Sequence, residues 1–553
     1  MPCRRGHDRR LPSLLLLGLV AAAPAHAQDK TASIDRIFSW VKPGSPGCVA
    51  AASHNGALVV NRAYGLADLE RNVPLTADSV FDAASIRKQF VAAAILLLVE
   101  EKRLALTDDV RKYIPELPDY GRTITLDHML SHTSGLRDWT GLRNFNSGSE
   151  PAMPMILRQR ALDFAPGEEW AYSNSGYVLL TEIVARRSGM PFSEFARTRL
   201  FEPLGMTSTT YVDDLRQVVK NRALAFEPQG AGWRMDMLID NERGGGGALF
   251  STASDLVLWS DGLTSGRLGR FVTDKLEEPA KLNNGRVLDY GRGLIAGTNY
   301  AGRLFHHGGG AAGFRSVLVR FPDSRISVAV LCNAGEASDD RDGFAARIFD
   351  LFAAPGGVRP PAAPTPATAG GAPIEGLDLS GKAGVFVNDQ TGRLLRLAAA
   401  NGRLVVAGAG PLVAVTKDRF RIARPTMEFM SKDAFEITFL SGDQFEYTSM
   451  EGRTTRYRRA RPWAPTAGEL TAYAGRYESD ELRARFQIVP GKTGLAIRLN
   501  DAPGEAPEFP GVVRDTFQRG NLVLRFQRNS AGAITGVQFT TPVFRNVPFA
   551  LTR

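Results

Sequence analysis

The sequence has few of the residues that build metal centres. Its 553 residues include three cysteines and seven histidines, and no Cys or His spacing resembles a metal framework. We therefore expect no metal site and no cofactor. Cys48 and Cys332 fall in apolar, strand-like runs, and we expect two separately buried thiols. Their pairing in an oxidising compartment is the alternative.

No apolar run is long enough to span a bilayer. The run at residues 14–23 has about ten residues, whereas a membrane helix needs about 20. Four arginines precede this run, and Ala25-His26-Ala27 follows it as a small-x-small cleavage site. This pattern predicts a signal peptide over residues 1–27 and a periplasmic or secreted protein without a stable membrane span. An uncleaved N-terminal anchor is the alternative.

The sequence also lacks concentrated charge of one sign. The leader holds four Arg and one Asp, so its removal lowers the formal net charge from +9 to +6. The remaining basic residues are scattered along the chain. Proteins that bind nucleic acids gather Lys and Arg into patches, so we expect no nucleic-acid partner.

Residues 28–354 mix strands with helices. Strands are predicted at 48–53, 57–64, 315–321 and 326–332. Helices are predicted at 90–101, 176–189 and 343–352. Strands at both ends with helices between them indicate an α+β domain, in which one sheet is closed by the two ends of the domain.

The C-terminal part has almost no helical periodicity. Residues 355–374 are dense in Pro, Gly and Ala, which predicts an extended linker. The segment 379–386 resembles 470–477, and short alternating strands follow each copy. We therefore predict two small all-β barrel domains at 375–463 and 464–553. The sequence leaves open whether the barrels regulate the protein, bind a polymer or shape a cleft.

The first candidate catalytic element is Ser85-Ile86-Arg87-Lys88. Residues three apart share one face of a helix, so the Ser85 hydroxyl and the Lys88 amine can meet. A serine hydroxyl becomes a good nucleophile only when a neighbour takes its proton. A partly buried lysine among apolar side chains can do this at neutral pH.

The second element is Tyr172-Ser173-Asn174, on a loop that leads into a helix. We expect Tyr172 to relay a proton between Ser85 and the leaving group. We expect Asn174 to hold Lys88 and a substrate amide. An ordinary helix-capping loop is the alternative interpretation.

The third element is His307-Gly308-Gly309, which continues into Gly310. A glycine-rich strand edge lets a substrate lie close to the backbone. The backbone N–H groups of Ser85 and Gly310 are predicted to form an oxyanion hole. His307 is expected to add a donor or partial positive charge near the developing anion.

Two short motifs elsewhere match by chance. A second Ser-x-x-Lys runs from Ser39 to Lys42 but leads into no buried helix. Lys492-Thr493-Gly494 fits a common form of the third element, but a hairpin turn in the last β unit explains it.

Taken in order, the three elements resemble those of the serine β-lactamase and penicillin-binding protein superfamily, in its class C β-lactamase-like branch. The resemblance extends over about residues 35–350 and is carried by the segments 81–88, 130–136, 172–177, 203–206 and 307–314. It implies an antiparallel sheet flanked by helices and a helical subdomain, with the site between them. It also implies structural rather than catalytic roles for His132, Ser134 and Gly135. The His-x-Gly motif followed by two barrels is most similar to the D-aminopeptidases of this family.

The resemblance implies hydrolysis of an amide or ester through an acyl-enzyme on Ser85. Small D-amino-acid peptides, esters or related peptidoglycan fragments are the expected substrates. Carboxylesterase and β-lactamase activities use the same machinery and stay open. A penicillin-binding sensor or scaffold that acylates without turnover is the alternative of another class. The exact substrate, the deacylating base and the oligomeric state are left open.

Overall fold

The structure is a computed structural model that describes residues 25–143, 145, 150–237, 247–339, 341–353, 377–407, 410–422, 435–448, 454–500, 506–541 and 543–552. It divides into two units, Met1–Trp40 and Val41–Arg553. In the first unit, the described residues form helix α1 (Ala25–Ile37). Most of the predicted signal peptide lies outside the described residues, and its last three positions begin α1.

A six-stranded antiparallel sheet organises the N-terminal half of the second unit. In spatial order its strands are β10 (Ile295–Asn299), β11 (Gly302–Ala311), β12 (Phe314–Phe321), β13 (Ile326–Cys332), β1 (Cys48–His54) and β2 (Ala57–Tyr64). Strands β1 and β13 are neighbours although most of the domain separates them in sequence. The two ends of the domain therefore close one sheet, as the sequence predicts.

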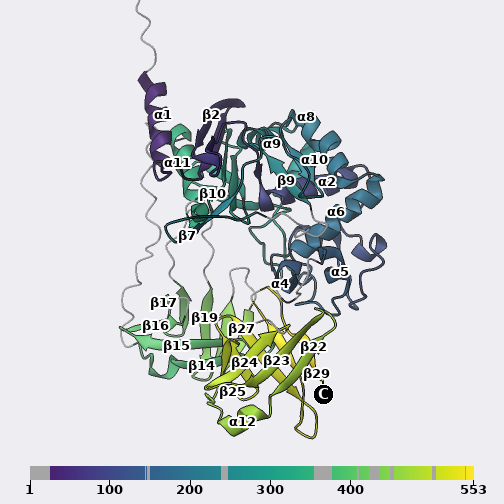
Figure 1. The fold of residues 1–553 in the computed structure, drawn as a ribbon, viewed down its shortest axis with the longest axis vertical. Helices are drawn as coiled ribbons and strands as arrows, with labels where there is room; N and C mark the ends of the chain where they lie inside the picture. Colours follow the sequence, from purple (N-terminus) through teal and green to yellow (C-terminus); the bar gives the residue numbers. More distant parts are fainter. Residues whose placement is uncertain are drawn as a thin grey trace, which may run out of the picture. The chain divides into compact units, whose positions relative to one another are not determined.

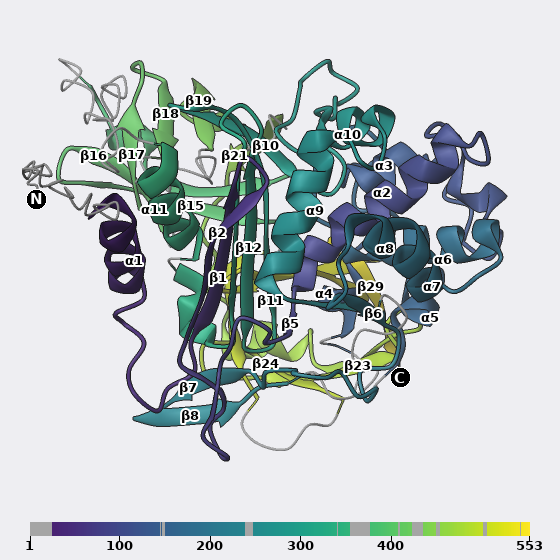
Figure 2. The ribbon, with the colours of Figure 1, turned by 90° about the horizontal axis from the view of Figure 1, so that it is seen from above.

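Helices cover both faces of this sheet (Figure 2). On one face, Asp261 of α9 (Ala253–Ser265) accepts hydrogen bonds from Ser53 and Ser327, at 2.8 and 2.7 Å. On the other face, α11 (Arg341–Ala353) stacks Phe349 on Phe321, with ring centroids 3.6 Å apart. Because both faces are covered, every residue of β13 is buried.

A helical subdomain is inserted between the strands. Its helices and helical turns are η1 (Ala84–Ile86), α2 (Arg87–Glu100), η2 (Val110–Lys112), α3 (Leu126–Leu130), α4 (Trp139–Arg143), α5 (Ala152–Leu157), α6 (Asn174–Ser188), α7 (Phe192–Ala196), η3 (Arg197–Phe201), α8 (Glu202–Leu204) and α10 (Arg270–Glu277). Helix α2 is apolar on all sides and buried over most of its length, as expected of a helix in the middle of a core. Its Phe90 packs against Phe201 and Trp259.

Short strands complete this half of the chain. They are β3 (Leu66–Asp68) with β4 (Val73–Pro74), β7 (Phe226–Gln229) with β8 (Gly232–Met235), and the three-stranded set β5 (Phe81–Asp82), β9 (Ala248–Ser251) and β6 (Thr210–Val212). Strand β5 ends just before the turn that carries Ser85, so this small sheet fixes the approach to the candidate nucleophile.

The C-terminal part forms two closed eight-stranded barrels, in which consecutive strands pair and the last strand pairs with the first (Figure 1). The first barrel follows the turn η7 (Ser380–Lys382) and comprises β14 (Gly384–Asn388), β15 (Leu394–Ala400), β16 (Arg403–Val406), β17 (Gly410–Ala414), β18 (Arg419–Ile422), β19 (Glu436–Ser441), β20 (Gln444–Thr448) and β21 (Thr454–Arg459). The second follows helix α12 (Ala467–Thr471) and comprises β22 (Gly475–Ser479), β23 (Ala484–Pro490), β24 (Gly494–Leu499), β25 (Glu508–Val513), β26 (Thr516–Arg519), β27 (Leu522–Arg528), β28 (Ile534–Thr540) and β29 (Val547–Thr552).

The predicted fold class is confirmed, because a β-lactamase-like α+β domain precedes two barrels. The predicted internal similarity is also visible in the structure. Each barrel begins at a glycine, Gly384 or Gly475, and buries an aromatic ring two residues later, that of Phe386 or Tyr477. The predicted linker at 355–374 lies outside the described residues, and the predicted domain boundaries stay predictions.

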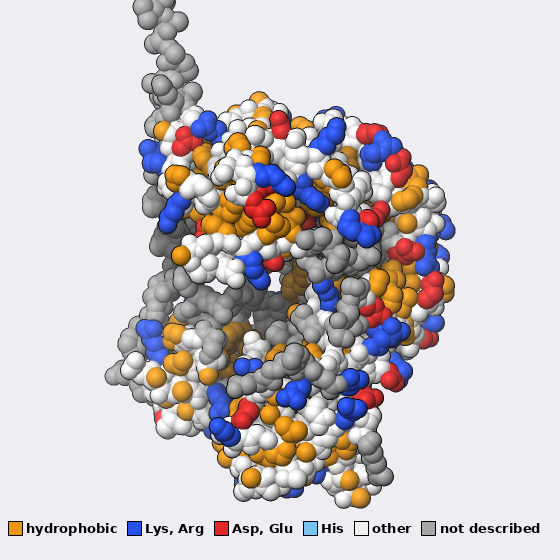
Figure 3. All heavy atoms as spheres, viewed as in Figure 1, with side chains coloured by type: hydrophobic (Ala, Val, Ile, Leu, Met, Phe, Trp, Pro, Cys, Tyr) orange, Lys and Arg blue, Asp and Glu red, His pale blue; other side chains and the backbone are white. Residues whose placement is uncertain are grey.

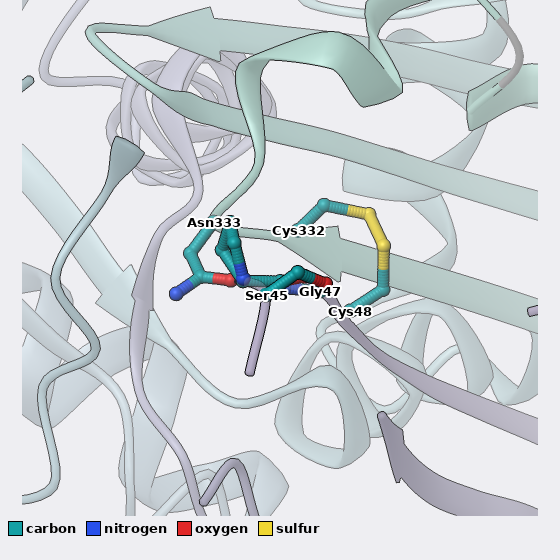
Figure 4. The surroundings of a disulfide bond; sticks show 6 residues. Ser45, Gly47, Cys48, Cys332 and Asn333 are labelled. Carbon is teal, nitrogen blue, oxygen red and sulfur yellow. A yellow bond between two sulfur atoms is a disulfide. The ribbon is translucent and has the colours of Figure 1, made fainter. Parts of the chain in front are cut away.

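The two cysteines of the sheet form a disulfide, so the expectation of two separate thiols is wrong. Cys48 of β1 lies directly opposite Cys332 of β13 in the strand register, and their sulfurs are bonded (Figure 4). Beside the bridge, the Asn333 side chain accepts a hydrogen bond from the backbone N–H of Gly47, at 2.8 Å. The sequence indicated two apolar strands but not that these would be neighbours in register.

Charges of both signs are interspersed on the face of the molecule shown in Figure 3. This agrees with the expectation of scattered rather than clustered basic residues. Within the described parts of the chain, no helix is both long and apolar enough to cross a membrane.

The disulfide should stabilise the sheet measurably. A bridge that closes a loop of 284 residues restricts the unfolded chain, and loss of such a bridge typically costs about 2–4 kcal/mol. We expect the thermal midpoint of the wild type to fall in dithiothreitol. The double variant Cys48→Ala/Cys332→Ala should start from a lower midpoint and not respond to the reductant. Equal midpoints for the double variant and the untreated wild type would show that the bridge contributes nothing.

Candidate active site

The turn before Ser85 is held in an unusual backbone conformation. Ala84 has φ +51°, a left-handed value that is costly for alanine and is maintained only by its surroundings. The Asp82 carboxylate accepts a hydrogen bond from the Ala84 N–H at 2.8 Å. The Ser316 hydroxyl donates to the Ala83 carbonyl at 2.9 Å. Strands β5 and β12 thus fix the turn that presents Ser85.

Ser85 and Lys88 come together as their spacing predicts. Ser85 lies on turn η1, and Lys88 lies on the first turn of α2. The Lys88 Nζ atom donates to Ser85 Oγ at 3.3 Å and to Asn174 Oδ1 at 2.8 Å. The Lys88 side chain is buried (0% exposed), whereas Ser85 is partly exposed. A buried amine is therefore fixed beside an accessible hydroxyl.

Tyr172 encloses the amine from another side. The Lys88 Nζ atom lies 4.5 Å from the centroid of the Tyr172 ring. The Tyr172 hydroxyl is buried and makes no hydrogen bond of ordinary geometry with the described residues. Burial raises the pKa of Tyr172, and the neighbouring Ser85 side chain opposes this shift only in part. Tyr172 is consequently a neutral phenol at physiological pH.

Asn174 is oriented by a carboxylate. Its Nδ2 group donates to Asp138 Oδ2 at 2.9 Å, which leaves Oδ1 facing Lys88. A flipped amide would bring its donors against the amine and its oxygen against the carboxylate. Asp138 thus sets the direction of the Asn174 dipole.

The glycine-rich segment forms an open strand edge beside Ser85. Strand β10 pairs with β11 only as far as His306, so the following residues extend beyond it. Gly310 is exposed on this stretch. A Cβ atom at Gly309 would lie 2.6 Å from the Ala83 carbonyl oxygen and 3.0 Å from the Ala84 Cβ. Glycine at 309 therefore allows β11 to approach the nucleophile turn closely.

A buried hydrogen-bond chain supports this strand. The Ser173 N–H donates to His132 Nδ1 at 3.1 Å. His132 Nε2 and His307 Nε2 both contact the Tyr290 hydroxyl at 3.1 Å, and His307 Nδ1 contacts the Gly308 carbonyl at 2.6 Å. With neutral imidazoles, these contacts fit one proton order, in which each group donates to the next, from His132 through Tyr290 and His307 to that carbonyl.

These hydrogen bonds bear on the expected role of His307, which stays a prediction. Both of its ring nitrogens are engaged with neighbouring groups, so the structure does not leave a free N–H for an oxyanion. His132 has the structural place that the resemblance implies. Tyr290 and Asp138 were missed by the sequence analysis, since no short motif links them to the three elements. Asp138 follows the segment 130–136 closely, which is the one signal that could have drawn attention to it.

The two chance matches are confirmed as such. Ser39 and Lys42 are both exposed, and Ser39 hydrogen-bonds the Arg36 carbonyl. Lys492-Thr493-Gly494 lies at the turn between β23 and β24, where the backbone N–H groups of Lys492 and Thr493 bind Glu508.

Comparison with known proteins agrees with this arrangement. Residues 25–351 match the Beta-lactamase family. The chain belongs to this family. Penicillin-binding protein 4* of Bacillus subtilis is 29% identical over 344 residues, which cover 56% of this chain and 74% of that protein. The D-aminopeptidase of Brucella canis is 26% identical over 529 residues, which cover 91% of this chain and 95% of that enzyme. The family and these relatives support a serine hydrolase of the β-lactamase fold.

Solved structures share the fold. The octameric penicillin-binding protein homologue from Pyrococcus abyssi has a TM-score of 0.52 at 22% identity, and the match covers 78% of this chain and 99% of that one. SurE has a TM-score of 0.52 at 20% identity and covers 96% of this chain and 99% of its own. The second match extends over the barrels as well as the Beta-lactamase domain.

The buried His132 should make stability depend on pH. Burial, followed by the influence of Lys88 and His307, keeps the pKa of His132 well below 6.5. In the unfolded chain His132 therefore becomes protonated near pH 6.5, whereas in the folded chain it stays neutral. The free energy of unfolding should fall as the pH drops below 6.5, by up to about 1.4 kcal/mol per pH unit from this group.

Denaturation between pH 5 and 7.5 measures this dependence. The control is His132→Asn, because asparagine tolerates the φ of +61° found at this position. The variant should be less stable overall but should lose stability less steeply on acidification. Parallel curves for the two proteins would contradict the assignment of a neutral His132.

Proposed function

We propose that this chain is an exported serine hydrolase that forms an acyl-enzyme on Ser85 and acts on amide or ester bonds of D-amino-acid peptides. The observation that carries the proposal is the 3.3 Å contact between Ser85 Oγ and the buried Lys88 Nζ. Lys88 in its amine form takes the Ser85 proton as the oxygen attacks the substrate carbonyl carbon.

Tyr172 supplies the second proton transfer. Its burial keeps the phenol protonated, so it is suited to donate rather than to start as a base. Tyr172 gives its proton to the departing amine or alkoxide and regains one from Lys88. The bond from the carbonyl carbon to the leaving group breaks, and an ester to Ser85 remains.

The negative charge that develops on the carbonyl oxygen is held by backbone donors. The N–H groups of Ser85 and Gly310 take this role, because the turn carrying Ser85 packs against β11 where Gly309 leaves space. Fixed donors aimed at a developing oxyanion typically contribute about 3–4 kcal/mol each to the transition state. Water then attacks the ester, the acid product leaves, and Ser85 regains its proton.

Relatives and domain content support the proposed substrate class. The D-aminopeptidase of Brucella canis aligns over nearly the whole chain, barrels included. We therefore place D-amino-acid peptides and amides, including peptidoglycan fragments, ahead of β-lactams and simple esters. Carboxylesterase and β-lactamase activities would use the same residues.

Export is supported by the leader and by the disulfide. A basic segment, an apolar run and Ala25-His26-Ala27 form the leader, and disulfides such as Cys48–Cys332 persist in oxidising compartments. We expect N-terminal sequencing of the protein from a periplasmic or culture fraction to begin at Gln28. An intact Met1 in that fraction would contradict cleavage.

A hydrolase panel with matched variants tests the catalytic proposal. The panel contains D- and L-amino acid amides, D-peptides, p-nitrophenyl esters and a chromogenic β-lactam. We expect turnover of D-amides with Ser85→Ala reduced by at least about 10³-fold, as is typical when a nucleophile is removed. Ser39→Ala, in the chance match, is the control and should retain wild-type rates.

Mass spectrometry of the trapped intermediate identifies the acylated residue. An adduct on the peptide that contains Ser85 is expected. Slow release of a fluorescent penicillin from Ser85 without turnover of any panel substrate would replace the hydrolase with a penicillin-binding sensor. Full activity of Ser85→Ala would remove the proposed mechanism.

A further inference from the structure

The second barrel holds part of the Beta-lactamase domain in its own hydrophobic core. Leu142 of α4 belongs to the same buried cluster as the inward-facing residues of β22–β29. The Phe145 ring adds contacts to the rings of Phe486, Phe539 and Phe544, with centroids 6.2, 5.0 and 5.4 Å away. The segment around α4 is thereby fixed to the barrel.

A buried ion pair also joins the second barrel to the Beta-lactamase domain. Glu481, between β22 and β23, accepts a hydrogen bond from Arg137 Nη1 at 2.7 Å. The two side chains are 5% and 2% exposed. Glu481 also accepts from the Arg160 N–H at 3.0 Å, and its carbonyl accepts from Gln159 at 3.3 Å. A buried, charge-assisted contact with several partners defines the position of Arg137 closely.

Arg137 adjoins the residues that orient the catalytic amide. Its carbonyl accepts a hydrogen bond from Ser175 Oγ at 2.6 Å, and the Trp139 N–H donates to the same hydroxyl at 2.9 Å. Between them, Asp138 binds Asn174, which in turn binds Lys88. The segment 137–139 is therefore bonded on one side to the barrel and on the other to the start of α6.

We propose that Glu481 of the second barrel is a positioning residue for the active site. Through Arg137 it holds Asp138 where the carboxylate fixes the Asn174 amide, which holds the Lys88 amine beside Ser85. This inference rests on the proposed role of Ser85 and Lys88. It gives the second barrel a function in catalysis, because Glu481 adds a charged contact at 2.7 Å to the longer contacts of Arg137 with Gln159 and Asp163, at 3.2 and 3.5 Å.

The test uses Glu481→Gln, which keeps the shape of the side chain and removes its charge. The control is Asp480→Asn, the neighbouring residue, which is 89% exposed and pairs only loosely with Arg160 at 3.9 Å. The readout is the rate at which a fluorescent fluorophosphonate labels Ser85 in the full-length protein. Labelling needs an activated serine but no knowledge of the substrate.

We expect Glu481→Gln to slow labelling at least about 10-fold, since small displacements of catalytic groups have effects of this size or larger. Asp480→Asn should stay within twofold of wild type. The pH profile of labelling should shift in Glu481→Gln and not in Asp480→Asn. The reason is that the Asn174 amide, which binds Lys88, is no longer held in place. With a turned-over substrate, kcat should fall while KM changes little.

A double-mutant cycle separates positioning from folding. Asp138→Ala, which leaves the barrel contact in place, should slow labelling on its own. Adding Glu481→Gln to it should then slow labelling little further, although the two losses in thermal stability should still add. Additive losses in labelling, or wild-type labelling in folded Glu481→Gln, would overturn the proposal.

The two proposals can fail separately. Absence of wild-type labelling at Ser85 would refute the proposed nucleophile. Normal wild-type labelling with no effect of Glu481→Gln would refute the positioning role alone. If Glu481→Gln does not fold, Asp138→Ala still decides, because wild-type labelling in that variant removes the link between the barrel and Lys88.

Discussion

The placement of one buried amine determines the chemistry of this protein. Lys88 lies between the hydroxyl of Ser85, the amide of Asn174 and the ring of Tyr172. These three groups come from two segments, each with its own supports. A buried amine is costly unless polar neighbours satisfy it, and those neighbours must be held precisely in place. The left-handed turn at Ala84 and the buried Asp138 are parts of that support.

Much of this arrangement could be predicted from the sequence because the signals are local. A spacing of three residues places Ser85 and Lys88 on one face, and the apolar run after them indicates the buried helix that excludes water. The two barrels could be recognised from a repeated segment and from alternating strands. In each case neighbouring residues carry the information that defines the element.

Other features depend on contacts between distant segments, which no local pattern contains. The disulfide requires that Cys48 and Cys332 be opposed in register, and a shift of one residue would place their side chains on different faces. The contact of the His307 Nε2 atom with the Tyr290 hydroxyl likewise joins segments that no short motif links. Glu481 lies 344 residues from Arg137, and nothing near either residue indicates the other.

The central position of β13 has a consequence for biosynthesis. Strand β1 is made early, yet its partner on one side is the last strand of the sheet. Until residue 332 has left the ribosome, the hairpin of β1 and β2 exposes a row of unpaired backbone groups that invites association with other chains. Contacts of such long range also slow folding. A nascent chain of this architecture therefore depends on protection of one strand edge for the time needed to synthesise nearly 300 residues.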